Sequence, residues 1–288
     1  MNTRRLVALA TVLLAGCTAC GSSVAAPQGS PSPSAVRHAS LDVDGLKRTY
    51  RLYVPPSLDP NQNVPLVVLL HWAGGTGDKM AATKYDAQAA TGKFIAVYPD
   101  STDGLWRASG DDPDFDVTFI NNLLDRLTTD FRIDKARIFA AGLSIGAMMA
   151  YRLACQLSNR FVAIASVAGA MLVNDCHPAL PVSILEMHGT ADSTVPYKGN
   201  ADFPPTRSTV QSWVKLDGCP GAPVQTAGGI TTTSAWKGCR GGTSVRLDTI
   251  EGGQHVWFGS DPSGSSVAGE PDATKTSWGF FSGLAPRA

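Results

Sequence analysis

The feature that most constrains the fold is the stretch Gly-Leu-Ser-Ile-Gly at residues 142–146, because of what stands on either side of it. Residues 138–141 are apolar and favour a buried strand, and residues 147–155 favour a helix. A turn that joins strand to helix this abruptly leaves no room for side chains at its two glycines. Ser144 then stands alone at the tip, near the positive end of the helix dipole. The alternative is a Gly/Ser-rich helix start without a chemical role.

The composition is that of an ordinary globular protein. Of the 288 residues, 43% are hydrophobic, and 24 basic residues balance 24 acidic ones. Balanced charge gives no reason to expect a nucleic acid or a strongly anionic surface as a partner. Without the N-terminal segment, roughly 250 residues remain, which suits one large α/β domain with a substantial core.

The N-terminus has the features of an export signal. Arg4 and Arg5 precede an apolar run at 6–15 that is too short to span a membrane. The run ends in Leu-Ala-Gly before Cys17, which resembles a bacterial lipobox. We therefore expect cleavage before Cys17 and attachment of a lipid to this cysteine. A plain secretory signal cleaved near residues 25–26 is the alternative, and both interpretations predict export.

This interpretation divides the chain into three segments. Residues 1–16 are the expected lipoprotein signal peptide. Residues 17–38 are rich in Ser, Pro and Gly, which predicts a flexible tether. Residues 39–288 are the expected folded domain. The predicted location is extracellular or at the cell surface, with the membrane reached through the N-terminal lipid.

Six cysteines suit an oxidising compartment. Four of them lie in the folded part, and four cysteines allow three pairings. We favour Cys155 with Cys176 and Cys219 with Cys239, because each pair closes a loop of about 20 residues, worth roughly 3 kcal/mol. Free buried thiols are the alternative.

Apolar runs alternate with helical patterns along the folded part. Two short alternating runs, 40–43 and 48–54, favour strands joined at a hairpin. Further strands are expected at 64–70, 94–98, 138–141, 161–167, 181–187 and 244–250, and helices at 117–131, 147–155, 209–216 and 274–284. This order predicts an α/β fold with a mostly parallel sheet covered by helices on both faces.

A serine at such a turn needs a base and an orienting acid to act as a nucleophile. Strand–G-x-S-x-G–helix is the nucleophile elbow of α/β-hydrolases, in which the order along the chain is Ser, acid, His. Among the five histidines only His255 follows every plausible acid, and it lies in a Gly-rich loop after the last strand. The other four precede Ser144 or come too early: His38, His71, His177 and His188.

The acid should lie in a loop at the carboxyl end of a strand beyond Ser144. Asp192 meets this condition, since it follows the strand at 181–187. The less well placed alternatives are Asp217, Asp248, Glu251 and Glu186. The predicted catalytic residues are therefore Ser144, Asp192 and His255.

An oxyanion hole requires two N–H donors. One is expected from Ile145, after the nucleophile, and the other from Ala73, in the Gly-rich loop after the strand at 64–70. Three aromatic residues are candidates for substrate binding: Trp72, Trp106 and Trp257. No metal-ligand pattern is visible, and no cofactor is expected.

With these residues in place, the chain resembles the secreted polyhydroxybutyrate depolymerase and feruloyl esterase-like group, which has the α/β-hydrolase fold. The matching stretches are 142–155, His-Gly-Thr-Ala-Asp at 188–192 with Val-Pro-Tyr at 195–197, and Gly-Gly-Gln-His-Val-Trp at 252–257. The resemblance spans about residues 41–284 and supports the three catalytic residues and both disulfides. One departure is Trp72, where the group usually has glycine.

The leading hypothesis is an exported serine esterase that acts on polyhydroxyalkanoate oligomers, feruloyl esters or other small acyl esters. The ester substrate could be polymeric or linked to polysaccharide. One alternative is a serine peptidase of the prolyl type, which usually carries an extra domain that this chain is too short to hold. Another is a tethered, non-catalytic binding lipoprotein built on a hydrolase scaffold.

Overall fold

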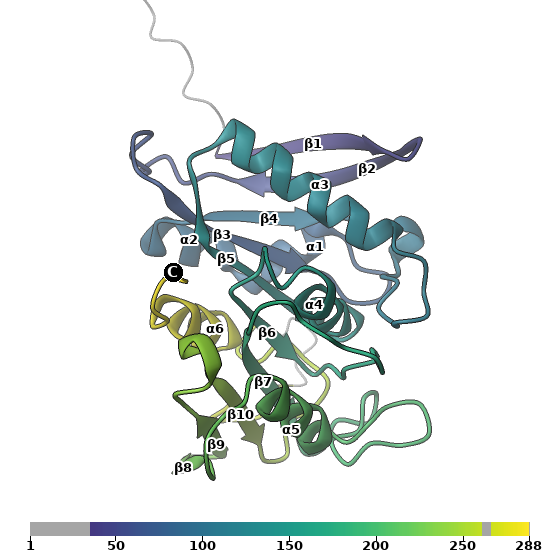
Figure 1. Ribbon diagram of the computed structural model, residues 1–288, viewed down its shortest axis with the longest axis vertical. Coiled ribbons are helices and arrows are strands. Elements are labelled where there is room, and N and C mark those ends of the chain that lie inside the picture. The colour runs from purple at the N-terminus through teal and green to yellow at the C-terminus, as the bar shows by residue number, and fades with distance from the viewer. Residues whose placement is uncertain (1–34, 261–265, 288) are drawn as a thin grey trace, which may run out of the picture. The chain divides into compact units, whose positions relative to one another are not determined.

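The computed structural model describes residues 35–260 and 266–287. These residues fold around one ten-stranded sheet. The strand order is β1-β2-β4-β3-β5-β6-β7-β10-β9-β8, as Figure 1 shows. The strands are β1 (Val36–Val43), β2 (Leu46–Tyr53), β3 (Val64–Leu70), β4 (Ile95–Pro99), β5 (Ile133–Leu143), β6 (Ala163–Val167), β7 (Ser183–Gly189), β8 (Val224–Gly228), β9 (Thr231–Trp236) and β10 (Val245–Ile250).

The centre of the sheet is parallel and its two edges are antiparallel. Strands β4, β3, β5, β6, β7 and β10 run parallel to one another. The pair β1–β2 adds antiparallel strands at one edge, and β9–β8 adds them at the other. Because parallel strands end on the same side, the loops after β3, β5, β7 and β10 leave from one edge of the sheet.

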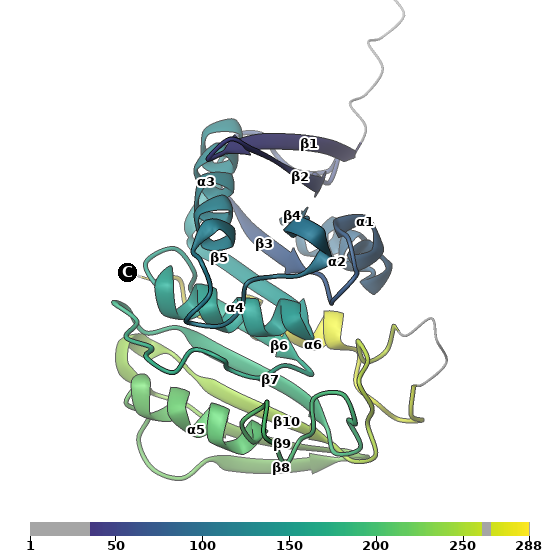
Figure 2. The same cartoon turned by 90° about the vertical axis from the view of Figure 1, so that its right-hand side faces the viewer.

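Helices cover both faces of this sheet. In β3, the residues Leu66, Val68 and Leu70 belong to one apolar cluster, whereas Val67 and Leu69 belong to the other. Such a strand, buried on both faces, reads as a continuous apolar run. Figures 1 and 2 show the helices α3, α4 and α5 over one face and α1, α2 and α6 over the other. Their bounds are α1 (Gly77–Met80), α2 (Tyr85–Gly92), α3 (Phe115–Asp130), α4 (Ile145–Gln156), α5 (Thr206–Leu216) and α6 (Ala273–Ser282).

The expected α/β fold with a mostly parallel sheet is confirmed, and the domain begins earlier than expected. Strand β1 begins at Val36, so residues 36–38 belong to the sheet and not to the tether. The hairpin between β1 and β2 turns at Asp44 and Gly45, both with positive φ, as a type I′ turn requires. The cleavage site, Cys17 and most of the expected tether lie outside the described residues.

Two strands and two helices were not expected from the sequence. Strand β8 is exposed along its whole length and β9 is rich in threonine, so neither carries the apolar pattern of a buried strand. They form because β9 pairs with β10 and β8 pairs with β9. Helices α1 and α2 are short and lie in a stretch without a clear apolar period.

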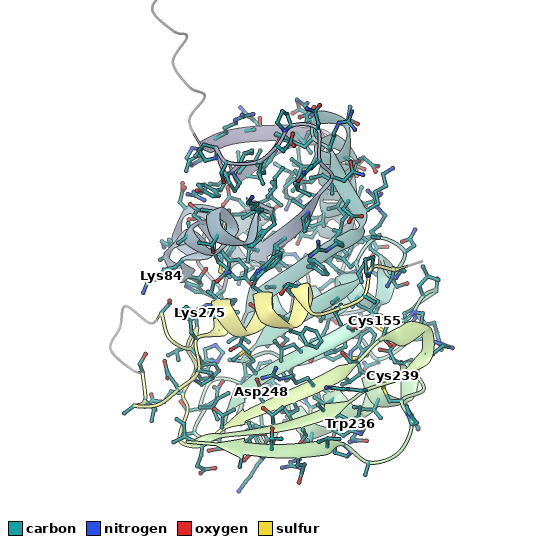
Figure 3. All side chains as sticks on the ribbon, turned by 90° about the vertical axis from the view of Figure 1, so that its left-hand side faces the viewer. Lys84, Cys155, Trp236, Cys239, Asp248 and Lys275 are labelled. Carbon is teal, nitrogen blue, oxygen red and sulfur yellow. A yellow bond between two sulfur atoms is a disulfide. The ribbon has the colours of Figure 1, made fainter. Side chains whose placement is uncertain are left out.

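The four cysteines of the folded part form two disulfides. Cys155 is bonded to Cys176 and Cys219 to Cys239, with sequence separations of 21 and 20 residues. The first bridge joins α4 to the segment after β6, and the second joins the end of α5 to the segment after β9 (Figure 3, in which Cys155 and Cys239 are labelled). Both pairings are the ones that the loop lengths favour.

Loss of either bridge is expected to lower the free energy of unfolding by about 3 kcal/mol, because each bridge restricts the unfolded chain. The measurement is thermal unfolding of Cys155→Ser/Cys176→Ser and Cys219→Ser/Cys239→Ser variants beside the parent protein. Peptide mapping without reduction should recover the same two pairs. A peptide that links Cys155 to Cys219 or Cys239 would show that the pairing is wrong.

Within the described part of the chain, no helix is both long and apolar enough to span a membrane.

Candidate active site

The turn between β5 and α4 has the geometry that its two glycines predict. A Cβ on Gly142 would lie 2.4 Å from the backbone of Gly146, and one on Gly146 would lie 2.2 Å from the carbonyl oxygen of Leu70. Ser144 has φ 59° and ψ −125°, a conformation that residues with side chains adopt only under strain. The turn therefore holds Ser144 in a strained backbone at the carboxyl end of β5, with a half-buried side chain.

Backbone N–H groups are free beside this serine. The N–H of Ser144 donates to Val167 O at 3.0 Å, and helical hydrogen bonding begins with Met148, which donates to Ser144 O. The N–H of Ile145 precedes the first helical bond, so it has no acceptor within α4. Among the described residues, the N–H groups of Ile145 and Ala73 both lack a hydrogen-bond partner. Both expected oxyanion donors thus have no acceptor among the described residues.

The loop that carries Ala73 is fixed by buried contacts of His71, the first residue after β3. Its Nε2 accepts a hydrogen bond from the N–H of Ser101 at 3.1 Å, so Nδ1 carries the proton and donates to Trp72 O at 2.8 Å. Burial lowers the pKa of His71, which keeps the ring neutral. The carbonyl oxygen of His71 accepts from the indole N–H of Trp106 at 3.0 Å. Through these three hydrogen bonds, His71 holds the loop that carries Ala73 in place.

Two of the three candidate substrate-binding tryptophans lie in the core instead. Trp106 is 1% exposed and its N–H is taken up by His71 O, while Trp257 is 3% exposed and donates to Thr274 Oγ1. A buried ring whose N–H is already paired presents no surface to a substrate. Trp72 is half-buried, in the loop that carries Ala73.

The expected acid and base are in direct contact. His255 Nδ1 donates to Asp192 Oδ2 at 2.8 Å. The other carboxylate oxygen, Oδ1, accepts from the N–H groups of Thr194 at 2.9 Å and Val195 at 2.8 Å. The side chain of Asp192 is fully buried and that of His255 is 19% exposed. Because Nδ1 carries a proton, the neutral ring of His255 has Nε2 free to accept one.

Two backbones must approach closely to form this contact. The loop after β7 and the loop after β10 meet where Ala191 donates to Gly253 O at 3.0 Å. A Cβ on Gly189 would lie 2.1 Å from the same oxygen, so only glycine fits there. The glycines of the two loops thus bring Asp192 and His255 together.

The surroundings of Asp192 favour its ionised form. Burial alone would raise the pKa of this carboxyl, but hydrogen bonds from His188 and His255 outweigh burial and hold the pKa well below its usual range. Asp192 is therefore a carboxylate across the range between about pH 5 and 8 in which histidine titrates.

Three of the four alternative acids are buried among other groups, and the fourth is exposed. Glu186 contacts His188, and Asp217 is buried at the end of α5, where burial raises its pKa to about 6. Asp248 lies on β10, as Figure 3 shows, and pairs with Arg246, while Glu251 is exposed. Within the described residues, none of these four carboxylates contacts His255.

The three candidate catalytic residues follow the carboxyl ends of parallel strands, on the same edge of the sheet. Ser144 follows β5, Asp192 follows β7 and His255 follows β10. In the described part of the chain no hydrogen bond joins Ser144 Oγ to His255. Such a contact often tightens only when substrate binds. The structure therefore joins Asp192 to His255 and, among the described residues, leaves the Ser144 hydroxyl unpaired on the same edge.

A buried group beside Asp192 was not identified from the sequence. His188 was set aside because it precedes the acid, yet its Nε2 lies 3.4 Å from Asp192 Oδ2. The motif His-Gly-Thr-Ala-Asp contained the signal, since residues 188 and 192 face each other across one tight turn.

A hollow of about 780 Å³ lies between the segment after β6 and the segment that leads into α5. Met171, Leu172 and Phe203 are among its apolar lining residues. None of Ser144, Asp192 and His255 lines it, so the candidate site is the sheet edge and not this hollow.

Within the described residues, no group of three or more His, Cys, Asp or Glu side chains is arranged to hold a metal ion.

Comparison with known proteins identifies the family of this chain. The family model described as esterase PHB depolymerase, for polyhydroxybutyrate, matches residues 48–198, which is more than half of the chain. The chain belongs to this esterase family. The match includes the turn at Ser144 and the acid Asp192.

Curated relatives and solved structures extend the match. Feruloyl esterase D of Neurospora crassa is 26% identical over 255 residues, which are 84% of this chain and 84% of that protein. Feruloyl esterase B of Piromyces equi is 29% identical over 222 residues, 70% of this chain but only 41% of that protein. The acetyl xylan esterase from Aspergillus awamori superposes with a TM-score of 0.66 at 16% identity, over 85% of this chain and 99% of that chain. The protein is a carboxylic ester hydrolase with the α/β-hydrolase fold.

Proposed function

We propose that this esterase works by a Ser-His-Asp acyl-enzyme mechanism, with Ser144 as nucleophile, His255 as base and Asp192 as orienting acid. The observation that carries the proposal is the 2.8 Å hydrogen bond between Asp192 and His255, on the sheet edge where the strained turn carries Ser144. This bond fixes the tautomer of His255 in which Nε2 can accept the serine proton.

The chemistry follows from these positions. His255 Nε2 takes the proton of Ser144 as Oγ bonds to the carbonyl carbon, and the oxyanion that forms accepts hydrogen bonds from the N–H groups of Ala73 and Ile145. His255 then gives its proton to the departing alcohol oxygen, which breaks the ester bond and leaves an acyl-serine. Water attacks the acyl carbon with His255 again as base, and Ser144 regains its proton as the carboxylic acid leaves.

For the substrate, we propose small acyl or aromatic acyl esters, among them feruloyl esters and hydroxyalkanoate oligomers. Two relatives are named feruloyl esterases, and the family is described by polyhydroxybutyrate depolymerisation. A panel of nitrophenyl acyl, methyl feruloyl and hydroxybutyrate oligomer esters, each measured as kcat/KM, tests this proposal. Hydrolysis of none of them would contradict it, and a peptide substrate that is cut faster than any ester would favour a peptidase.

The rate of ester hydrolysis is expected to rise with pH across the range in which histidine titrates, between about pH 5 and 8. His255 must be neutral to accept the serine proton, whereas Asp192, whose pKa lies well below its usual range, stays ionised throughout. The measurement is the pH profile of kcat/KM for one nitrophenyl ester. A profile that is flat over this range would argue against a histidine base.

We also propose that the protein is exported and held at the cell surface by a lipid on Cys17. The lipobox-like sequence before Cys17 and the two disulfides support this location. Metabolic labelling with a radioactive fatty acid should mark the full chain but not a Cys17→Ala variant. Equal labelling of both proteins would contradict the lipid anchor.

A further inference from the structure

His188 lies at the end of β7 with its side chain fully buried. Both ring nitrogens face acceptors: Nδ1 lies 2.9 Å from Glu186 Oε1, and Nε2 lies 2.8 Å from the carbonyl oxygen of Val195 and 3.4 Å from Asp192 Oδ2. The remaining polar neighbour is the hydroxyl of Thr206 at 3.2 Å from Nδ1. Two buried carboxylates therefore flank a single imidazole ring.

The hydrogen bonds determine the charge of this ring. A carbonyl oxygen only accepts, so Nε2 must donate to Val195 O. If Glu186 is ionised, Nδ1 must donate as well, and a ring that donates from both nitrogens is an imidazolium. Burial alone would lower the pKa of His188, but the hydrogen bonds to Asp192 and Glu186 outweigh burial and raise it to about 10.

The network continues to the helix of the nucleophile. Glu186 Oε2 accepts from the hydroxyl of Tyr151 at 2.8 Å, and Tyr151 lies on α4, which begins directly after Ser144. The ring of Tyr197 packs edge-on against His188, with 5.8 Å between the ring centroids. The charged groups that face His188 are thus Glu186 on its own strand and Asp192 on the following turn.

We propose that His188 is a positioning residue: a buried imidazolium that holds Asp192 in place and offsets its charge. This inference rests on the proposed catalytic role of Asp192. His188 anchors the turn through Val195, whose N–H binds Asp192 Oδ1 and whose carbonyl oxygen binds His188. It also stands between two carboxylates that would otherwise repel each other in a buried site.

The charge of His188 also acts on His255. Without His188, the negative charges of Asp192, which contacts His255, and of Glu186, which lies on the far side of His188, would favour the imidazolium form of His255, which cannot accept the serine proton. The positive charge of His188 cancels part of that field, so we infer that His255 becomes neutral at a lower pH than it would with both carboxylates uncompensated. His188 therefore tunes the pH at which the base works, without touching the substrate.

The test is the pH profile of kcat/KM for His188→Gln, in which glutamine can still donate to Val195 but carries no charge. We expect the acid limb to move to higher pH by about one unit, with activity recovered in alkaline solution. The matched control is His177→Gln, because His177 is 82% exposed and, of the residues that the structure describes, pairs with Asp175 alone. A purely structural role predicts a uniformly lower rate with an unmoved limb, and that result would overturn the proposal.

A measurement on the parent protein keeps the proposal testable if His188→Gln does not fold. Nitrogen-15 NMR of the histidine rings should show His188 protonated on both nitrogens between about pH 6 and 9, where a free histidine loses its proton. A neutral His188 at pH 7 would overturn the inference and leave the proposed catalytic residues standing. Full activity in Asp192→Asn would instead overturn the proposed mechanism, while the charge of His188 would still be read from the same spectra.

Discussion

Replacement of Ser144 by alanine is expected to lower kcat for ester hydrolysis by about 10⁴- to 10⁶-fold. The substitution removes the hydroxyl that we propose forms the acyl-enzyme, and residues that act as a unit lose nearly all activity when one is deleted. The side chain is half-buried at the tip of a turn and fills no core space, so the fold should persist. The measurement is kcat on a nitrophenyl ester, with the melting temperature as a check on folding.

The matched control for this variant is Ser282→Ala. Ser282 is an exposed serine at the end of α6, and its loss makes the same chemical change away from the sheet edge. We expect this variant to keep the parent rate. If Ser144→Ala turned over ester near the parent rate, Ser144 would not be the nucleophile.

Replacement of Asp192 by asparagine is expected to lower kcat by about 10⁴-fold without unfolding the domain. Asparagine can keep the hydrogen bonds from Thr194 and Val195 through its oxygen. Its NH₂ group then faces His255 Nδ1 and favours the tautomer with the proton on Nε2, which cannot accept the serine proton. The loss therefore comes from the wrong tautomer and the lost charge rather than from the fold.

The control is Asp175→Asn, since Asp175 and His177 form an exposed Asp–His pair at 2.7 Å outside the site. We expect Asp175→Asn to leave kcat unchanged. A fully active Asp192→Asn enzyme would move the role of the acid to Glu186, Asp217 or Glu251. The structure favours none of these three, because in the part of the chain that it describes none of them contacts His255.

The central strands and the turn at Ser144 could be predicted because their constraints are local. Strand β3 is apolar at every position and buried on both faces, so its pattern alone identified it at 64–70. The glycines of the turn are required by backbone contacts within a few residues and with the end of β3. The chain order of serine, acid and histidine then left one histidine and one well-placed aspartate.

The features that could not be predicted depend on partners far away in the sequence. Strand β8 is exposed along its length and exists only because β9 lies beside it. Trp106 stands in a polar loop, and nothing in that loop shows that the carbonyl oxygen of His71 will take its N–H. His188 was set aside by its place in the chain order, whereas its role follows from the tight turn that brings it against Asp192.

The most direct measurement of the proposed mechanism is covalent labelling with a fluorophosphonate, followed by intact mass and peptide mapping. The strained turn presents Ser144 next to the free N–H of Ile145, and the proposed base, held by Asp192, lies on the same sheet edge, so this serine should react. We predict one phosphonyl adduct per chain, on the peptide that contains Ser144, and no adduct on Ser144→Ala. An adduct on another residue, or equal labelling of Ser144→Ala, would contradict the account.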